Sequence, residues 1–209
     1  MSEEIVDRQT HWQRVYQTKP AETVSWYRPQ LSTSLELLQL AGLSPESRLI
    51  DVGAGASTLV DDLLVRGLRD ITVLDISAEA LAVSRQRLAE RASGVTWLTA
   101  DLLSAALPAS GFDLWHDRAV SHFLTDASDV ARYAQQAAAA VRTAGYAVIA
   151  GFAPDGPERC SGLPVARRSA RDIAAMLGQA FELVDERRER HLTPGGVPQS
   201  FAYALLRRR

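Results

Sequence analysis

A short apolar run that ends in two closely spaced glycines constrains the fold of this chain most strongly. Residues 49–57 read Leu-Ile-Asp-Val-Gly-Ala-Gly-Ala-Ser, and an amphipathic stretch follows over residues 58–66. The apolar run is typical of a buried strand, and the glycines allow a sharp turn and a close approach of the backbone to a ligand. This order predicts the first strand, turn and helix of an α/β sheet with a ligand crevice at its edge.

The rest of the chain alternates apolar runs of strand length with amphipathic stretches, which favours a parallel sheet covered on both faces. The expected strands cover residues 48–52, 71–75, 95–99, 112–116 and 146–152. The expected helices cover residues 31–41, 58–66, 78–92, 126–142 and 169–179. A length of 209 residues suits a single domain over residues 1–209.

The C-terminal part of the chain has a different pattern. Two alternating stretches, 181–190 and 200–207, flank the turn sequence Pro194-Gly195-Gly196 and should pair antiparallel. We therefore expect a Rossmann-like, doubly wound sheet of seven strands, mostly parallel, with an antiparallel hairpin at the C-terminus.

Three acids, Asp51, Asp75 and Asp101, lie at or just beyond the carboxyl ends of the first three predicted strands and indicate what the crevice binds. Asp75 lies 20 residues beyond Gly55, where a carboxylate can accept both hydroxyl hydrogens of a ribose. Asp101 can accept a hydrogen bond from the exocyclic amine of adenine. Ile76, which follows Asp75, and Leu102, which follows Asp101, should lie beside the nucleoside. The spacing predicts a nucleoside-containing cofactor.

Asp51, two residues before Gly53, decides between two such cofactors. A dinucleotide would bring a pyrophosphate to the turn, which Asp51 would repel, and a third glycine is replaced by Thr58. S-adenosylmethionine instead brings an ammonium and a sulfonium, which an acid attracts. The charges favour S-adenosylmethionine, although a tight turn without a ligand is the alternative for these residues.

From the first strand to the C-terminus these motifs resemble the class I S-adenosylmethionine-dependent methyltransferases. The segments His11-Trp12-Gln13-Arg14-Val15-Tyr16 and Val24-Ser25-Trp26-Tyr27 are similar to the opening of the methyltransferase-like family that includes the lysine methyltransferases of citrate synthase and elongation factor 1-alpha. The resemblance implies that Trp12, Tyr16 and Tyr27 line the cofactor site, in a lid segment covering residues 1–28. A hydrophobic lid packed on the sheet is the alternative for these aromatic residues.

The segment after the fourth strand should meet the methyl acceptor. It reads His116-Asp117-Arg118, and either His116 or Asp117 could act as a general base. A strand-end histidine beside an Asp117–Arg118 ion pair is the alternative. The loop over residues 151–165 is too rich in glycine and proline for a helix, lies at the ligand edge, and contains Cys160, which we expect to be inert.

Composition limits the partners and the compartment. A net charge of −2 does not favour nucleic acid, a single cysteine favours a reducing compartment, and no segment has the apolar length of a membrane span. The polar N-terminus lacks the apolar core of a signal peptide. We expect a cytoplasmic protein without a metal ligand cluster, which is a monomer or weak dimer and binds neither nucleic acid nor membrane.

The resemblance predicts an enzyme that methylates a protein lysine or a small-molecule nucleophile. A non-catalytic S-adenosylmethionine-binding sensor or partner subunit is the main alternative, and an NAD-linked reductase is a more distant one. Inserted loops usually set the choice of acceptor, so a likeness at the level of the fold does not identify it.

Overall fold

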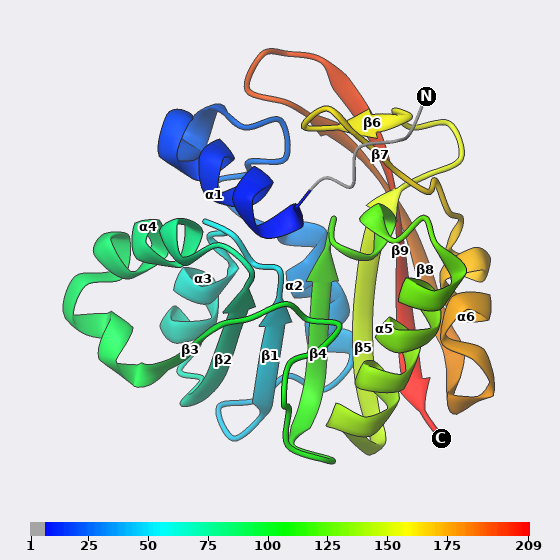
Figure 1. The fold of residues 1–209 in the computed structure, drawn as a ribbon. Coiled ribbons are helices and arrows are strands. Elements are labelled where there is room, and N and C mark those ends of the chain that lie inside the picture. Colours follow the sequence, from blue (N-terminus) through cyan, green and yellow to red (C-terminus); the bar gives the residue numbers. More distant parts are fainter. Residues whose placement is uncertain (1–6) are drawn as a thin grey trace.

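A mixed sheet forms the centre of the molecule (Figure 1). The structure, a computed structural model, describes residues 7–209. Within them, seven strands form a sheet in the order β3-β2-β1-β4-β5-β9-β8. The strands are β1 Arg48–Val52, β2 Asp70–Asp75, β3 Val95–Thr99, β4 Phe112–Arg118, β5 Val141–Phe152, β8 Phe181–Leu192 and β9 Pro198–Arg208. The first five are parallel and the last two form an antiparallel hairpin, which confirms the predicted fold class.

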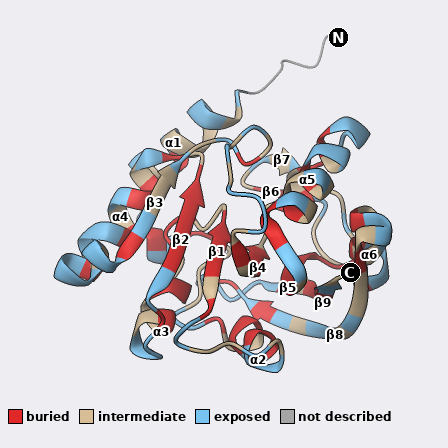
Figure 2. Cartoon of the chain, turned by 90° about the horizontal axis from the view of Figure 1, so that it is seen from below, coloured by how far each residue is buried: buried red, intermediate tan, exposed pale blue. Residues whose placement is uncertain are grey.

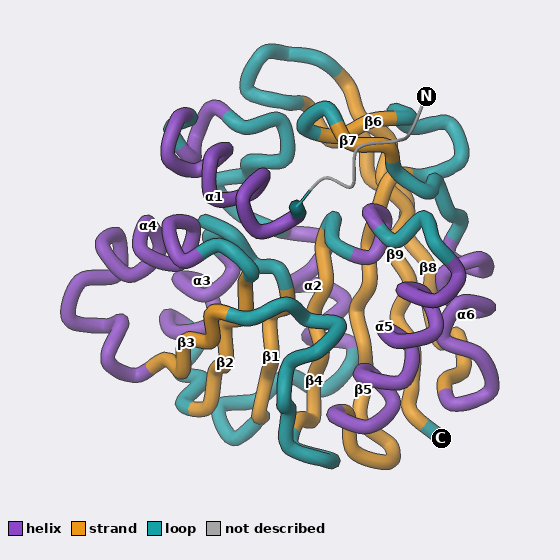
Figure 3. Tube along the Cα trace, in the orientation of Figure 1, coloured by secondary structure: helices purple, strands orange, loops and turns teal. Residues whose placement is uncertain are grey.

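Helices cover both faces of this sheet, and one helix lies across its edge (Figure 3). The helices are α1 Arg8–Thr18, α2 Ser32–Leu40, α3 Leu59–Val65, α4 Ala78–Leu88, α5 Ala127–Ala140 and α6 Ala170–Leu177. Short 3-10 turns cover Ala21–Thr23, Ala89–Gly94, Ser121–Phe123 and Gly178–Ala180. Within residues 7–209, no helix combines the length and the apolarity that a bilayer crossing requires.

Alternation along the strands divides the core into two layers (Figure 2). Leu49 packs with Leu38 of α2 and Leu63 of α3 on one face, whereas Ile50 packs with Trp115 and Tyr133 on the other. Successive strand residues point to opposite faces, so an uninterrupted apolar strand is buried on both. The apolar runs in the sequence therefore become central strands.

The structure differs from the sequence prediction mainly at element ends. β4 continues to Arg118 because His116 and Asp117 are buried and stay in register with β5. β5 begins at Val141, directly after α5, and passes an irregularity near Ala144, which has a φ of 61°. The loop after β5 contains no helix, as predicted, but folds into a small hairpin of β6 Arg159–Cys160 and β7 Leu163–Pro164.

The carboxyl ends of the five parallel strands meet at one edge, where Figure 1 shows α1 lying across β1 and β2. The Asp7 side chain caps the first turn of α1 by accepting from the Gln9 amide at 3.1 Å. Gln13 fastens this helix to the body of the protein: its side chain donates to Glu79 at 3.2 Å and accepts from the Ser77 hydroxyl at 3.1 Å. The edge and α1 together enclose the candidate site.

Candidate functional site

A cleft runs along the carboxyl edge of β2, β1 and β4 beneath α1. Its walls come from the turns after these strands, from α1 and the segment that follows it, and from the loop after β5. Of the residues predicted to form the site, ten line the cleft: Trp12, Tyr16, Tyr27, Asp51, Gly53, Asp75, Ile76, Asp101, Leu102 and His116. Gly55 lies beside it under Tyr16, and Asp117 does not line it.

Both glycines of the turn after β1 are required by the packing of the protein itself. Gly53 and Gly55 have φ angles of +57° and +56°, a region that residues with a side chain rarely adopt. A Cβ at Gly53 would lie 2.0 Å from Cγ2 of Val120, and a Cβ at Gly55 would lie 2.1 Å from the hydroxyl of Tyr16. The turn is therefore closed from above by α1 and from the side by the segment after β4.

Asp51 and His116 form a buried pair on adjacent strands. They are register partners of β1 and β4, and Nδ1 of His116 donates to Oδ1 of Asp51 at 2.7 Å. Nε2 of the same ring lies 2.9 Å from the hydroxyl of Ser34 on α2. All three side chains are almost completely buried. Both nitrogens of the imidazole are thus engaged, while Oδ2 of Asp51 is buried without a hydrogen-bond partner.

Asp75 ends β2 and shapes the neighbouring part of the cleft. Its Oδ2 accepts from the Gly55 amide at 2.7 Å and its Oδ1 from the Ser77 amide at 2.8 Å. Burial raises the pKa of Asp75 to about 6, against the lowering effect of these two amides. The carboxylate is rigidly held, and it loses its charge at a pH much nearer neutrality than an exposed aspartate does.

The far end of the cleft lies after β3. Asp101 is exposed, and its Oδ1 accepts from the Leu103 amide at 2.9 Å within the turn that follows β3. Leu102 is buried, and Ile76 and Leu74 line the same end of the cleft. An apolar slot beside an exposed carboxylate is suited to a flat, partly polar ring.

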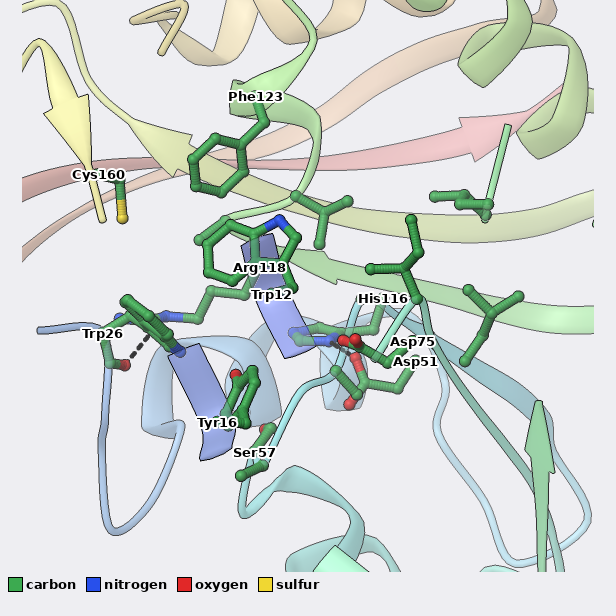
Figure 4. A pocket seen from close by; sticks show the side chains of 18 of the residues that line it. Trp12, Tyr16, Trp26, Asp51, Ser57, Asp75, His116, Arg118, Phe123 and Cys160 are labelled. Carbon is green, nitrogen blue, oxygen red and sulfur yellow. Dashed lines mark hydrogen bonds and ion pairs between the residues drawn. The ribbon is translucent and has the colours of Figure 1, made fainter. Parts of the chain in front are cut away.

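An aromatic cluster covers the middle of the cleft (Figure 4). Trp12 makes edge-to-face contacts with Trp26 and Phe123, at ring centroid separations of 5.7 Å and 5.1 Å. Tyr16 contacts Trp26 at 6.4 Å. Trp12 and Tyr16 come from α1, and a salt bridge from Arg8 at the start of this helix to Asp129 on α5 closes the other side. The segment predicted to form a lid contains α1 and the 3-10 turn Ala21–Thr23, its role as a lid stays a prediction, and residues 1–6 of it lie outside the described residues.

Comparison with known proteins identifies the family. Residues 49–145 match a family described as a methyltransferase domain. The chain is 25% identical over 123 residues to the eEF1A lysine and N-terminal methyltransferase of Mus musculus. This match covers 57% of this chain and 17% of that protein. The chain is also 35% identical over 78 residues to an uncharacterised methyltransferase of Mycobacterium tuberculosis. This match covers 37% of this chain and 38% of that protein. The chain thus spans well under half the length of the curated relatives it matches.

Solved structures share the fold over nearly the whole chain. The N-methyltransferase NodS of Bradyrhizobium japonicum, solved with S-adenosylhomocysteine, superposes with a TM-score of 0.71 at 17% identity, covering 95% of this chain and 98% of NodS. A protein from work on the conversion of a disulfide bond into a thioacetal group in echinomycin biosynthesis gives 0.71 at 21% identity, covering 96% and 92%.

Residues 49–145 therefore form a methyltransferase domain, and the fold that contains them is that of the class I S-adenosylmethionine-dependent methyltransferases. The predicted family and its cofactor, S-adenosylmethionine, are thereby confirmed. The acceptor groups of the cleft fit this cofactor. The unpartnered Oδ2 of Asp51 suits an ammonium, and Asp75 at the end of β2 suits a ribose diol. Which residue holds which part of the cofactor stays a prediction.

The methyltransferase cleft extends past His116 to a second region, which the sequence did not reveal. Arg118 lines it together with Trp26, Phe123 and Cys160 (Figure 4). The Arg118 side chain is 5% exposed, and its Nε donates to the Tyr203 hydroxyl and its Nη1 to the Trp26 carbonyl, each at 2.9 Å. Burial raises the pKa of Cys160 to about 12, so this thiol is protonated at neutral pH and lacks nucleophilic character, in agreement with the expectation that it is inert.

Asp117 has a structural role in this geometry. Its Oδ1 accepts from the Val120 amide at 2.9 Å, and its Oδ2 accepts from the Ser121 amide at 3.0 Å and from the Tyr133 hydroxyl at 2.6 Å. The side chain is completely buried and points away from the cleft lining. The geometry gives no support to the hypothesis that Asp117 is a general base, which stays a prediction, and Arg118 pairs with Glu189 where the alternative expected an Asp117–Arg118 ion pair.

His122 also lies outside the cleft lining. It packs between Phe123 and Phe152, and its Nδ1 accepts from the Phe152 amide at 3.3 Å. Burial lowers the pKa of His122 to about 3, so the ring is neutral at physiological pH. Its surroundings are those of a core histidine.

Proposed function

We propose that the chain transfers the methyl group of S-adenosylmethionine to a small-molecule nucleophile bound at the Arg118 end of the cleft. In this proposal the adenine lies beside Ile76, Asp101 and Leu102. Asp75 accepts from the ribose hydroxyls. The methionine part lies over the glycine turn, under Trp12, Tyr16 and Tyr27.

One observation carries this arrangement most directly. Oδ2 of Asp51 is buried, faces no hydrogen-bond donor, and belongs to a carboxylate whose other oxygen is fixed by His116. A buried acceptor without a donor is costly unless a ligand supplies one. An ammonium supplies both the charge and the hydrogen bond. The two glycines before α3 let Val120 and Tyr16 pack closely against the turn beside it.

The side chains around the cleft contribute alignment and the exclusion of water. Methyl transfer is a displacement in line with the breaking sulfur–carbon bond, so holding the two reactants in that line lowers the barrier. The aromatic residues from α1 cover the reacting centre, and Asp51 fixes the cofactor's amino group. Since both ring nitrogens of His116 are engaged, we propose that it positions Asp51 and does not remove a proton from the acceptor.

Enclosure of the acceptor end favours a small molecule over a protein side chain. Trp12, Trp26 and Phe123 crowd this end, and the loop bearing Cys160 borders it. The likeness to the eEF1A lysine and N-terminal methyltransferase supports a protein lysine as the second candidate. A lysine would have to enter as a long, narrow side chain.

Transfer of a tritiated methyl group into a cell extract tests the proposal. The extract is separated into small-molecule and protein fractions after incubation with the purified chain and labelled S-adenosylmethionine. We expect label in the small-molecule fraction, with little when Asp51→Asn replaces the wild type. Label in the protein fraction would favour the lysine candidate. Binding of S-adenosylmethionine without label in either fraction would favour a sensor or partner subunit.

A further inference from the structure

We propose that the methyl acceptor is a small planar molecule that presents a carboxylate to Arg118. This inference rests on the proposed function, because it concerns the acceptor end of the same cleft. It assigns Arg118 as the residue that selects the acceptor by its charge.

Arg118 offers a hydrogen-bond donor that the protein itself leaves unused. Two of its nitrogens are satisfied by Tyr203 and by the Trp26 carbonyl, and its guanidinium stacks over the Phe201 ring at 4.4 Å. The third nitrogen, Nη2, is buried and has no hydrogen-bond partner; Oε1 of Glu189, which is also unpartnered, lies 3.7 Å from it, beyond hydrogen-bond distance. These contacts hold the planar group rigidly, which lowers the entropic cost of binding a ligand at Nη2.

The charges around Arg118 leave a positive excess. Glu189 lies 3.7 Å from Nη2 of Arg118 and 3.3 Å from Nη1 of Arg28, so one carboxylate is shared by two guanidinium groups. Tyr203 donates its hydroxyl hydrogen to Glu189 at 2.8 Å. A second anion would balance this cluster, and a carboxylate matches the planar geometry of a guanidinium because it can accept two parallel hydrogen bonds. The same excess disfavours an ammonium, including that of a lysine.

The carboxylate of the cofactor itself is too far away to fill this role. Phe201, under the guanidinium, belongs to β9, which is separated from β1 by β4 and β5. Three strand spacings amount to roughly 14 Å. The cofactor's carboxylate shares a carbon with the ammonium assigned to Asp51 on β1. It therefore remains near β1, whereas the Arg118 guanidinium lies toward β9.

The surfaces beside Arg118 are flat and apolar. Trp12, Trp26 and Phe123 present ring faces and edges, and Cys160 presents a neutral thiol (Figure 4). Such surfaces bind a planar ring better than a flexible chain, because aromatic pairs combine a large contact area with a defined geometry. A ring carrying a carboxylate uses both features at once.

Three probes with one ring and different charges test this inference. Benzoate, benzamide and benzylamine, and the naphthyl analogue of each, are titrated calorimetrically into the wild-type chain saturated with S-adenosylhomocysteine. We expect the carboxylates to bind about tenfold or more tightly than the amides, and the amines to bind most weakly. Equal affinities, a preference for the amines, or no binding of any probe at millimolar concentration would overturn the proposal.

Matched variants assign the effect to Arg118. Arg118→Gln should lose the preference for carboxylates. If this variant folds poorly, Arg118→Gln combined with Glu189→Gln removes one charge of each sign and so keeps the local charge balance. The double variant should also lose the preference. Arg48→Gln is the control, because Arg48 pairs with Asp113 at the opposite end of the sheet.

The affinity for S-adenosylhomocysteine separates the possible failures. We expect the Arg118 variants to keep the wild-type affinity within a few-fold. If the double variant lost more than about tenfold in affinity for S-adenosylhomocysteine, Arg118 would be the partner of the cofactor's own carboxylate, and the proposal would be contradicted. No binding of S-adenosylhomocysteine to the wild type would contradict the proposed function itself.

Discussion

Nδ1 of His116 lies 2.7 Å from Oδ1 of Asp51, on the neighbouring strand of the sheet. The hydroxyl of Ser34 holds the other side of the imidazole at 2.9 Å. The contact fixes the rotation of the Asp51 carboxylate and leaves its second oxygen without a partner in the cleft wall. A histidine placed in this way acts through the acid it orients.

His116→Ala should weaken cofactor binding and destabilise the fold. The substitution leaves a buried carboxylate oxygen and a buried hydroxyl unpaired, which costs about 3 kcal/mol. His116→Asn, which keeps an N–H near Asp51, should recover most of both. Calorimetric titration of S-adenosylhomocysteine and urea unfolding measure the two effects. A general base would behave differently: His116→Asn would keep its cofactor affinity, lose about 10²–10⁴ in turnover and lose the acidic limb of the pH profile.

Asp117 should control stability rather than cofactor affinity. Tyr133→Phe removes one of its three donors and should cost about 1–2 kcal/mol in unfolding free energy. Asp117→Asn should cost more unfolding free energy, because the NH2 group of the new side chain would face the N–H donors of Val120 and Ser121. Urea unfolding and a titration of S-adenosylhomocysteine check this. If Asp117→Asn unfolded like the wild type but had lost turnover, Asp117 would have a catalytic role.

Cofactor affinity should fall as the pH drops through 6. Burial raises the pKa of Asp75 to about 6 from its ordinary value of 3.8. The ionised carboxylate accepts hydrogen bonds from a ribose diol and the protonated form accepts fewer, so affinity should decline by up to about tenfold per pH unit below 6. Fluorescence titration with S-adenosylhomocysteine between pH 5 and 8 measures this. The affinity of Asp75→Asn for S-adenosylhomocysteine should be low and nearly independent of pH.

The same shift has a consequence for the protein without its cofactor. The folded-state pKa of Asp75 lies above the unfolded-state value, so this group favours folding most below pH 3.8 and loses that contribution as the pH rises through 6. Asp75→Asn should remove this contribution from the pH dependence of unfolding. An unchanged pH dependence would mean that Asp75 titrates normally.

Gly55→Ala should loosen the lid. The new Cβ would lie 2.1 Å from the Tyr16 hydroxyl, and the φ of +56° adds about 1 kcal/mol of strain. Hydrogen exchange should show reduced protection over residues 8–18, with weaker binding of S-adenosylhomocysteine. Combining the variant with Tyr16→Phe should restore part of both, since the colliding oxygen is gone. Unchanged protection in Gly55→Ala would show that Tyr16 does not rest on the turn.

The sequence predicted the sheet and its acidic edge because these depend on local patterns. The strand over residues 48–52, the helix that begins after Ser169, and the C-terminal hairpin occur where predicted. Asp51, Asp75 and Asp101 also line one cleft, since parallel strands bring their carboxyl ends to the same edge.

The roles of His116 and Arg118, at the carboxyl end of β4, depend on partners that are distant in the sequence. His116 is held by Ser34, which lies 82 residues away, and Arg118 by Tyr203, which lies 85 residues away. Spacing along the chain carries no signal for such contacts. The pairing of Asp51 with His116 was accessible in principle, because the predicted sheet makes β1 and β4 neighbours and both residues occupy the carboxyl ends of these strands.

A calorimetric comparison of S-adenosylhomocysteine and NADH on the wild type and on Asp51→Asn tests the central claim most directly. We predict micromolar binding of S-adenosylhomocysteine to the wild type and no measurable binding of NADH. Asp51→Asn should weaken S-adenosylhomocysteine by about 2–3 kcal/mol, because the unpartnered oxygen then lacks the charge that holds the ammonium. Equal binding of S-adenosylhomocysteine by both proteins, or tighter binding of NADH, would contradict the account.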